Sequence, residues 1–188
     1  MRVFTALGSA RKEGSTAKVL GWIESELRAL GHEVDRADLY DFNIKACTGC
    51  NTCKLDMDAP GCIIEDDCDG LLQRLLEADA IVLASPLYFW GFTAQAKAFV
   101  DRSYALGKMS KEKPSLAMGR RISFLITGIG PVAGNIELLA ATFPMFIGKH
   151  GMSNPANLFV PGCFDPAEIP ASVQDEAKQV AQQLTATS

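Results

Sequence analysis

Apolar and polar positions alternate in blocks along this chain, and the blocks predict strands and helices in regular succession. An apolar run over 2–7 predicts a strand, and helical spacing follows at Val19, Leu20, Ile23, Leu27 and Leu30. Further strands are predicted at 33–39, 80–84, 122–126 and 158–160, and further helices at 68–77, 91–106, 137–150 and 173–184. Five strands that alternate with about five helices predict a doubly wound α/β sheet.

Two of these segments also indicate how they are placed or divided in the fold. The run 80–84 is apolar throughout, as expected of a central strand covered on both faces. Pro144 either kinks the helix predicted over 137–150 or opens a second one. We expect residues 185–188 to fray at the end of the chain.

The first strand runs into a loop of glycine, hydroxyl and basic residues. The candidate ligands in this loop are Ser9, Arg11, Ser15 and Thr16. Hydroxyls, a cation and the free N–H groups of a helix N-terminus suit a phosphate, and Gly8 and Gly14 allow a tight turn. The alternative is an ordinary capping loop, in which Ser15 or Thr16 caps the helix. The loop lacks the P-loop and G-x-G-x-x-G patterns, which argues against an ATPase and a standard NAD domain.

An aromatic segment follows the third strand. Ser85-Pro86-Leu87-Tyr88-Phe89-Trp90-Gly91-Phe92 begins where that strand ends, and ligands of open α/β sheets bind beyond the carboxyl ends of the strands. The segment therefore predicts contacts with a planar ring, although Phe92 and Trp90 fit packing roles better. The loop after the fourth strand, with Thr127 and Gly128, is expected at the same edge.

Composition narrows the class of protein. The chain has 188 residues, of which 48% are hydrophobic and 21% charged, with a net charge of −4. We expect one domain over 1–188, with no nucleic-acid partner and no attraction to an anionic membrane. A strand that begins at residue 2 leaves no room for a signal peptide, and no apolar run is long enough to span a membrane, so we expect a cytoplasmic protein.

Five of the six cysteines fall in an irregular segment at 47–68. Cys47, Cys50 and Cys53 have the compact C-x2-C-x2-C spacing of a ferredoxin half-site, with Cys62 as fourth ligand and Cys68 as its alternative. This predicts a [4Fe–4S] cluster. Three alternatives stay open: structural thiols, a zinc site that uses Cys50, Cys53, Cys62 and Cys68, and a redox disulfide. Cys163 is expected to be a packing residue.

These motifs together resemble those of flavodoxin-like NAD(P)H-dependent FMN reductases, and within them the iron-sulfur flavoproteins. The resemblance covers about residues 1–130 and rests on four segments, Gly8–Thr16, Ser85–Tyr88, Lys97–Arg102, and Cys47–Cys53 followed by Gly61-Cys62 and Asp66-Asp67. It implies a flavodoxin-like, five-stranded parallel sheet in the order 2-1-3-4-5 with helices on both faces. It also implies a homodimer or homotetramer in which neighbouring subunits complete the flavin pocket.

The resemblance further assigns roles to the candidate residues. It implies that Ser9, Arg11, Ser15 and Thr16 hold the FMN phosphate, that Pro86, Leu87, Tyr88 and Phe89 hold the isoalloxazine, and that Thr127 and Gly128 border the flavin. The cluster, on Cys47, Cys50, Cys53 and Cys62, is expected close to the flavin. Asp101-Arg102 is expected to be a structural landmark of its helix.

The function predicted is that of an FMN-dependent oxidoreductase. Electrons would pass from NAD(P)H, or from a reduced protein donor, through FMN to a small-molecule or ferredoxin-like acceptor. One alternative is a non-enzymatic electron carrier like flavodoxin, and another is a zinc-stabilised binding module without flavin. No residue is assigned acid–base or nucleophilic catalysis, because His32 and His150 have no partner pattern around them.

Overall fold

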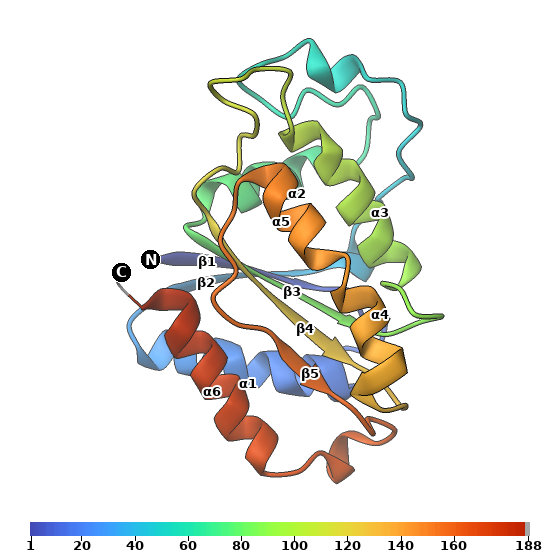
Figure 1. Ribbon diagram of the computed structural model, residues 1–188, viewed down its shortest axis with the longest axis vertical. Helices are drawn as coiled ribbons and strands as arrows, with labels where there is room; N and C mark the ends of the chain where they lie inside the picture. The colour runs from blue at the N-terminus through green and yellow to red at the C-terminus, as the bar shows by residue number, and fades with distance from the viewer. Residues whose placement is uncertain (187–188) are drawn as a thin grey trace.

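The computed structural model describes residues 1–186 and contains one five-stranded parallel sheet (Figure 1). Its strands are β1 (Arg2–Leu7), β2 (Glu33–Asp38), β3 (Ala80–Pro86), β4 (Arg121–Thr127) and β5 (Leu158–Val160). The strand order is β2-β1-β3-β4-β5, and every neighbouring pair is parallel. The predicted doubly wound, flavodoxin-like sheet is therefore confirmed.

Helices cover both faces of the sheet. On one face α1 (Ser15–Ala29) and α6 (Ser172–Thr185) lie side by side, and on the other lie α2 (Cys68–Glu77), α3 (Ala94–Arg102), α4 (Glu137–Ala140) and α5 (Phe143–His150) (Figure 1). Successive residues of a strand point to opposite faces. Accordingly Val82 packs with the α1–α6 core, whereas the adjacent Ile81 packs with the α2–α3–α5 core. Because both faces are buried, the run 80–84 of the central strand β3 is apolar throughout.

Several predicted boundaries shift in the structure. The helix expected over 91–106 begins only at Ala94, where the Thr93 hydroxyl accepts the Ala96 N–H at 3.3 Å, and after Arg102 it tightens to a 3₁₀ turn at Ser103–Leu106. Pro144 lies in the first turn of α5 and opens it as a separate helix, which decides between the two alternatives at 137–150. At the C-terminus, α6 extends through Thr185, and residues 187–188, part of the segment expected to fray, lie outside the described residues.

The two regions of predicted chemistry lie at opposite ends of the sheet. The loops after β1, β3, β4 and β5 all leave its carboxyl edge. The segment between β2 and α2, which carries the cysteines, extends to the far end of the molecule beside the segment between α3 and β4 (Figure 1). None of the helices in residues 1–186 combines the length and apolar character needed to cross a bilayer.

Candidate functional site

Hydrogen bonds tie the loops at the carboxyl edge of the sheet into one platform. The Leu87 N–H donates to the Thr127 carbonyl at 2.7 Å, which joins the loops after β3 and β4. The Cys163 N–H donates to the Gly128 carbonyl at 3.0 Å, which adds the loop after β5. On the other side the Thr93 hydroxyl donates to the carbonyl of Gly8 at 2.6 Å. The loops after β1, β3, β4 and β5 are therefore held in place by hydrogen bonds to one another.

A cavity of ≈ 260 Å³ opens between these loops. Every flavin-site residue predicted from the sequence lines it except Phe89. Its lining consists of Ser9, Arg11, Ser15, Thr16, Pro86, Leu87, Tyr88, Thr127, Gly128, Ile129, Cys163 and Phe164. One end is polar and lies at the start of α1, whereas the other is formed by the loops after β3, β4 and β5. A ligand with an anionic end and a flat apolar end matches this division.

The polar end contains an unsatisfied hydroxyl. Among residues 1–186 the buried Ser15 Oγ has no hydrogen-bond partner, and Gly14, the residue before α1, provides no side-chain cap. The Thr16 hydroxyl is instead bonded to Thr127 Oγ1 at 2.7 Å. The alternative in which Ser15 or Thr16 caps the helix is thus wrong. A buried polar group normally has a partner, and the first N–H groups of a helix carry partial positive charge, so this end suits an anion.

A strained turn follows the cavity wall at Tyr88. Tyr88 and Gly91 exchange both backbone hydrogen bonds at 3.0 Å, which leaves Phe89 and Trp90 as a two-residue turn with φ of 47° and 57°. Such turns normally use Asn and Gly, because bulky residues in the left-handed region are strained. Phe89 is 95% exposed and lines a second cavity, of ≈ 600 Å³, between this turn and the α3–α5 side. Backbone strain of this kind is commonly kept where a ligand or partner uses it.

The aromatic side chains of this turn divide into packed and exposed groups. Phe92 packs against Phe143 and Phe124 at ring-centroid distances of 6.1 and 6.4 Å, which confirms its packing role. Trp90 was expected in a core cluster or at an oligomer interface, and its 56% exposure excludes the core cluster within one chain. The turn aims it outward instead.

Three lining residues were not predicted from the sequence. Ile129 is the residue after Gly128, and Cys163 and Phe164 belong to the loop after β5. The sequence could have indicated Cys163 and Phe164, because the loop after β5 leaves the same edge of the sheet as the loops after β1, β3 and β4. Cys163 was expected only to pack, and it is indeed buried, with its thiol donating to the Val160 carbonyl at 3.3 Å.

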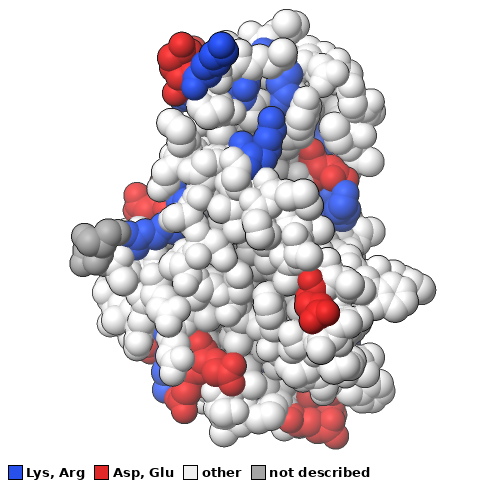
Figure 2. Space-filling model, in the orientation of Figure 1, with Lys and Arg blue, Asp and Glu red and all other residues white. Residues whose placement is uncertain are grey.

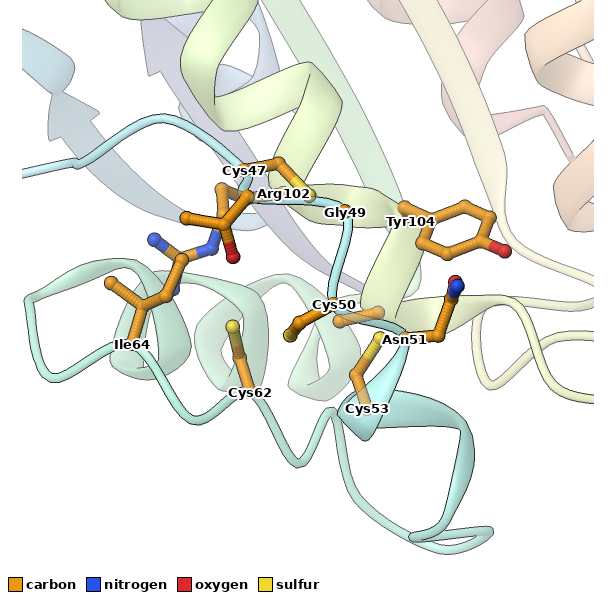
Figure 3. A pocket seen from close by; sticks show the side chains of 11 residues that line it. Cys47, Gly49, Cys50, Asn51, Cys53, Cys62, Ile64, Arg102 and Tyr104 are labelled. Carbon is orange, nitrogen blue, oxygen red and sulfur yellow. The ribbon is translucent and has the colours of Figure 1, made fainter.

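A second candidate site lies in the cysteine segment. Cys47, Cys50, Cys53 and Cys62 line one small cavity, together with Arg102 and Tyr104 from the end of α3 (Figure 3). The side chains of Cys50 and Cys62 point toward one another there (Figure 3). Cys47 and Cys50 are exposed, whereas Cys53 is buried. The structure therefore brings together the four cysteines predicted as ligands.

Cys68, the alternative ligand, lies outside this cavity. It is fully buried at the start of α2, and burial raises the pKa of its thiol to about 12. Hydrogen bonds from Thr52 lower the pKa of Cys50. The ease of forming a thiolate therefore differs greatly between Cys50, on the cavity, and Cys68, outside it.

The cysteine cavity is anchored by a buried ion pair. Arg102 Nη1 and Asp66 Oδ2 are 2.6 Å apart, and both side chains are at most 1% exposed. Asp66 also accepts the N–H groups of Lys45 and Cys68, at 2.8 and 3.0 Å. Asp66 thus bonds the first N–H of α2 and holds the segment before Cys47. Of the expected landmark Asp101-Arg102, Arg102 has this structural role, whereas Asp101 is exposed and pairs with Lys97.

Thiol chemistry fits a cluster, although the cavity is tight. The space between the four cysteines is ≈ 20 Å³, which is enough for one water molecule. Among residues 1–186, no three His, Cys, Asp or Glu side chains converge closely enough to hold a single metal ion. A cubane holds its four thiolates farther apart than a single ion does, so convergence on one ion is not the arrangement that a cluster needs.

Within one chain, the cysteine cavity is remote from the first cavity. The two cavities share no lining residue. The ≈ 260 Å³ cavity adjoins the loop that precedes α3, whereas the cysteine cavity adjoins the last turn of α3. The nine residues of α3 span about 13 Å. Within one chain α3 lies between the two cavities, and a cluster close to the flavin stays a prediction.

Fold and site together define a flavodoxin-like sheet with a cavity at its carboxyl edge, whose polar end lies at the start of α1. Residues 1–164 match the family model described as NADPH-dependent FMN reductase, and the chain belongs to this family. It is similar to an iron-sulfur flavoprotein of Archaeoglobus fulgidus, with 39% identity over 107 residues that cover 57% of this chain and 47% of the relative. An iron-sulfur flavoprotein of Methanocaldococcus jannaschii is 39% identical over 106 residues, 56% of this chain and 53% of the relative.

The chain thus spans about half the length of the curated relatives it matches. Among solved structures, the NAD(P)H:quinone oxidoreductase of Methanothermobacter marburgensis is similar with a TM-score of 0.75 at 16% identity, covering 100% of this chain and 98% of that one. This likeness supports the fold assignment over the entire length.

Proposed function

We propose that this protein is an FMN-dependent oxidoreductase that passes electrons from NAD(P)H, or from a reduced protein donor, to an acceptor. The observation that carries the proposal is the buried, unpartnered Ser15 hydroxyl at an uncapped helix start, within the cavity shared by the loops after β1, β3 and β4. Membership of the NADPH-dependent FMN reductase family supports FMN as the ligand. When bound, FMN supplies hydride and single-electron chemistry.

The residues of the cavity bind and orient the cofactor in this proposal. Ser9, Arg11, Ser15 and Thr16 hold the phosphate, with Arg11 as the cation at the rim. Pro86, Leu87 and Tyr88 lie along the isoalloxazine, and Thr127 and Gly128 border it. Phe89 turns away from this cavity and lines the ≈ 600 Å³ cavity beside it, so its role is at the mouth of the site. Among residues 1–186, no Asp, Glu, His or Lys side chain lines this cavity, so the protein contributes orientation and tuning.

The phosphate assignment is tested with two flavins. Arg11→Ala combined with Ser15→Ala removes charge-assisted hydrogen bonds worth about 1.5–3 kcal/mol each, so FMN affinity should fall at least tenfold while riboflavin affinity changes little. Lys12→Ala is the matched control, because Lys12 pairs with Asp41 at 2.6 Å and does not line the cavity. Equal losses for both flavins would refute the phosphate site.

We propose further that Cys47, Cys50, Cys53 and Cys62 bind a [4Fe–4S] cluster. Their common cavity, and relatives named as iron-sulfur flavoproteins, support this. A cluster at this position would let the protein exchange single electrons with a ferredoxin-like partner. Anaerobically purified protein should contain about four irons per chain. Cys50→Ser should remove the iron and spare the flavin, whereas Cys68→Ser should retain both.

Two other results would decide against the cluster. Zinc in place of iron would favour a metal-stabilised module, and freely titrating thiols without metal would leave a plain FMN reductase. Steady-state oxidation of NAD(P)H separates a reductase from a flavodoxin-like carrier, which shows flavin without turnover.

We propose that the protein works as a homodimer or homotetramer. The support is the exposed apolar surface beside the flavin cavity, where Phe89, Trp90 and Met145 are 95%, 56% and 69% exposed. Met145→Glu should dissociate the assembly in analytical ultracentrifugation, whereas Met109→Glu, at an exposed position away from this surface, should not. A monomeric wild-type protein would contradict the proposal.

A further inference from the structure

Two lysines cross the junction between the cysteine segment and the chain that follows α3. Lys108 is only 5% exposed, and its Nζ donates to the carbonyls of Cys53 at 3.1 Å and Ala59 at 2.6 Å, with Pro60 at 3.4 Å. It therefore reaches from the post-α3 segment into the cysteine segment.

Lys54 connects the same two segments in the opposite direction, from the cysteine segment to the chain that follows α3. Its Nζ donates to the carbonyls of Gly107, at 2.6 Å, and Tyr104, and lies 3.5 Å from the centre of the Tyr104 ring. Each ammonium thus starts on one segment and binds the backbone of the other. Together they fix the backbone at Cys53 and at the turn that precedes Cys62.

These two ammonium groups lack carboxylate partners. Over residues 1–186, neither lies within 4.0 Å of an Asp or Glu oxygen, whereas the buried guanidinium of Arg102 is paired with Asp66. Buried charges are normally paired with an opposite charge. Asp56, Asp58 and Asp69 act on Lys108 only from beyond that distance, so they balance its charge in part. The two ammonium groups adjoin Cys53, and in the face shown by Figure 2 most Lys and Arg side chains lie over the same upper half of the molecule. Thiolates that bind a cluster supply further negative charge beside them.

We propose that Lys54 and Lys108 are positioning residues of the cysteine site, which hold Cys53 and the 59–62 side fixed and balance the charge of the bound cluster. The inference rests on the proposed cluster. It divides the ligands into a fixed pair, Cys53 and Cys62, and an exposed pair, Cys47 and Cys50, that moves to admit the cluster. A nearby positive charge favours the reduced, more negative cluster, so both lysines should raise its midpoint potential.

The positioning role is tested first on metal-free protein. In Lys108→Met and Lys54→Met, alkylation of Cys53 by iodoacetamide should accelerate at least tenfold, measured by peptide mass spectrometry, while the already exposed Cys50 changes little. The control is Lys178→Met, which removes a lysine that pairs with Asp175 on the far face of the sheet. Unchanged alkylation of Cys53 in both folded variants overturns the positioning role.

The charge role is tested on iron-loaded protein. Lys54→Met should shift the cluster midpoint potential to a more negative value, and Lys54→Arg, which keeps the charge, should restore it. A potential that is the same in all three proteins overturns the charge role. Wild-type protein that takes up no iron overturns the proposed cluster and the charge role with it, whereas the alkylation result stands on its own and still decides the positioning role.

Discussion

The hydroxyls of Thr16 and Thr127 lie 2.7 Å apart in the buried floor of the flavin cavity, although 111 positions separate them in the chain. Thr16 belongs to the first turn of α1, and Thr127 is the last residue of β4. This single bond joins the start of α1 to the end of β4, and so links the two ends of the proposed FMN cavity.

Removing one partner of this bond should cost more than removing both. Thr127→Val leaves the Thr16 hydroxyl buried and unpaired, which should lower the free energy of unfolding by about 1–3 kcal/mol. The double variant, with Thr16→Val, should lose less than the sum of the two single losses. Urea denaturation of the four proteins completes the cycle, and strict additivity would show that the two hydroxyls are not coupled.

Relief of the strained turn should stabilise the protein and impair its site. Phe89→Asn combined with Trp90→Gly supplies the residues that two left-handed positions favour, so the free energy of unfolding should rise by about 1–3 kcal/mol. Flavin affinity or self-association should fall, measured by fluorescence titration and ultracentrifugation. Met109→Asn, which removes another exposed apolar side chain, is the control. A stabilised variant with unaltered binding and assembly would assign the turn no function.

The Arg102–Asp66 pair should be sensitive to loss of either member. Asp66→Asn leaves a buried guanidinium without its counterion, which should cost about 3–5 kcal/mol of unfolding free energy. Replacing both, with Asp66→Leu and Arg102→Met, should cost much less. Thermal or urea unfolding measures both losses. If Asp66→Asn proved neutral, the pair would not anchor the cysteine segment.

His150 should make stability fall in mild acid. Burial lowers the pKa of its imidazole from 6.5 to about 4, while its Nδ1 lies 3.1 Å from the Ser115 hydroxyl. Between pH 6.5 and 4 the imidazole is protonated in the unfolded chain and neutral in the folded chain. The free energy of unfolding is therefore full above about pH 6.5 and falls by about 3 kcal/mol as the pH drops toward 4.

Replacement of this histidine checks the source of the pH dependence. His150→Gln should flatten the dependence of unfolding free energy between pH 6.5 and 4, whereas His32→Gln should preserve most of it, because His32 is not fully buried. Identical pH profiles for wild type and His150→Gln would contradict the assignment.

Local patterns determined much of this protein. Apolar spacing predicted all five strands, and their alternation with helices led to the sheet, because hydrophobic periodicity follows from which faces are buried. The rule that loops meet at the carboxyl edge predicted where a ligand would lie, and the family resemblance then implied Ser9, Arg11, Ser15, Thr16, Tyr88 and Thr127, which line one cavity. The compact spacing singled out Cys47, Cys50 and Cys53 of the second cavity, with Cys62 as fourth ligand and Cys68 as its alternative.

Only the tertiary structure decided the relations that depend on distant contacts. The Thr16–Thr127 bond, the outward turn of Phe89 and the entry of Cys163 into the cavity follow from how loops pack on one another. The choice of Cys62 over Cys68, and the crossing of Lys54 and Lys108, required the fold of an irregular segment that has no periodicity. Periodicity reports which face of an element is buried, whereas the partner of a polar side chain is set by the path of the whole chain.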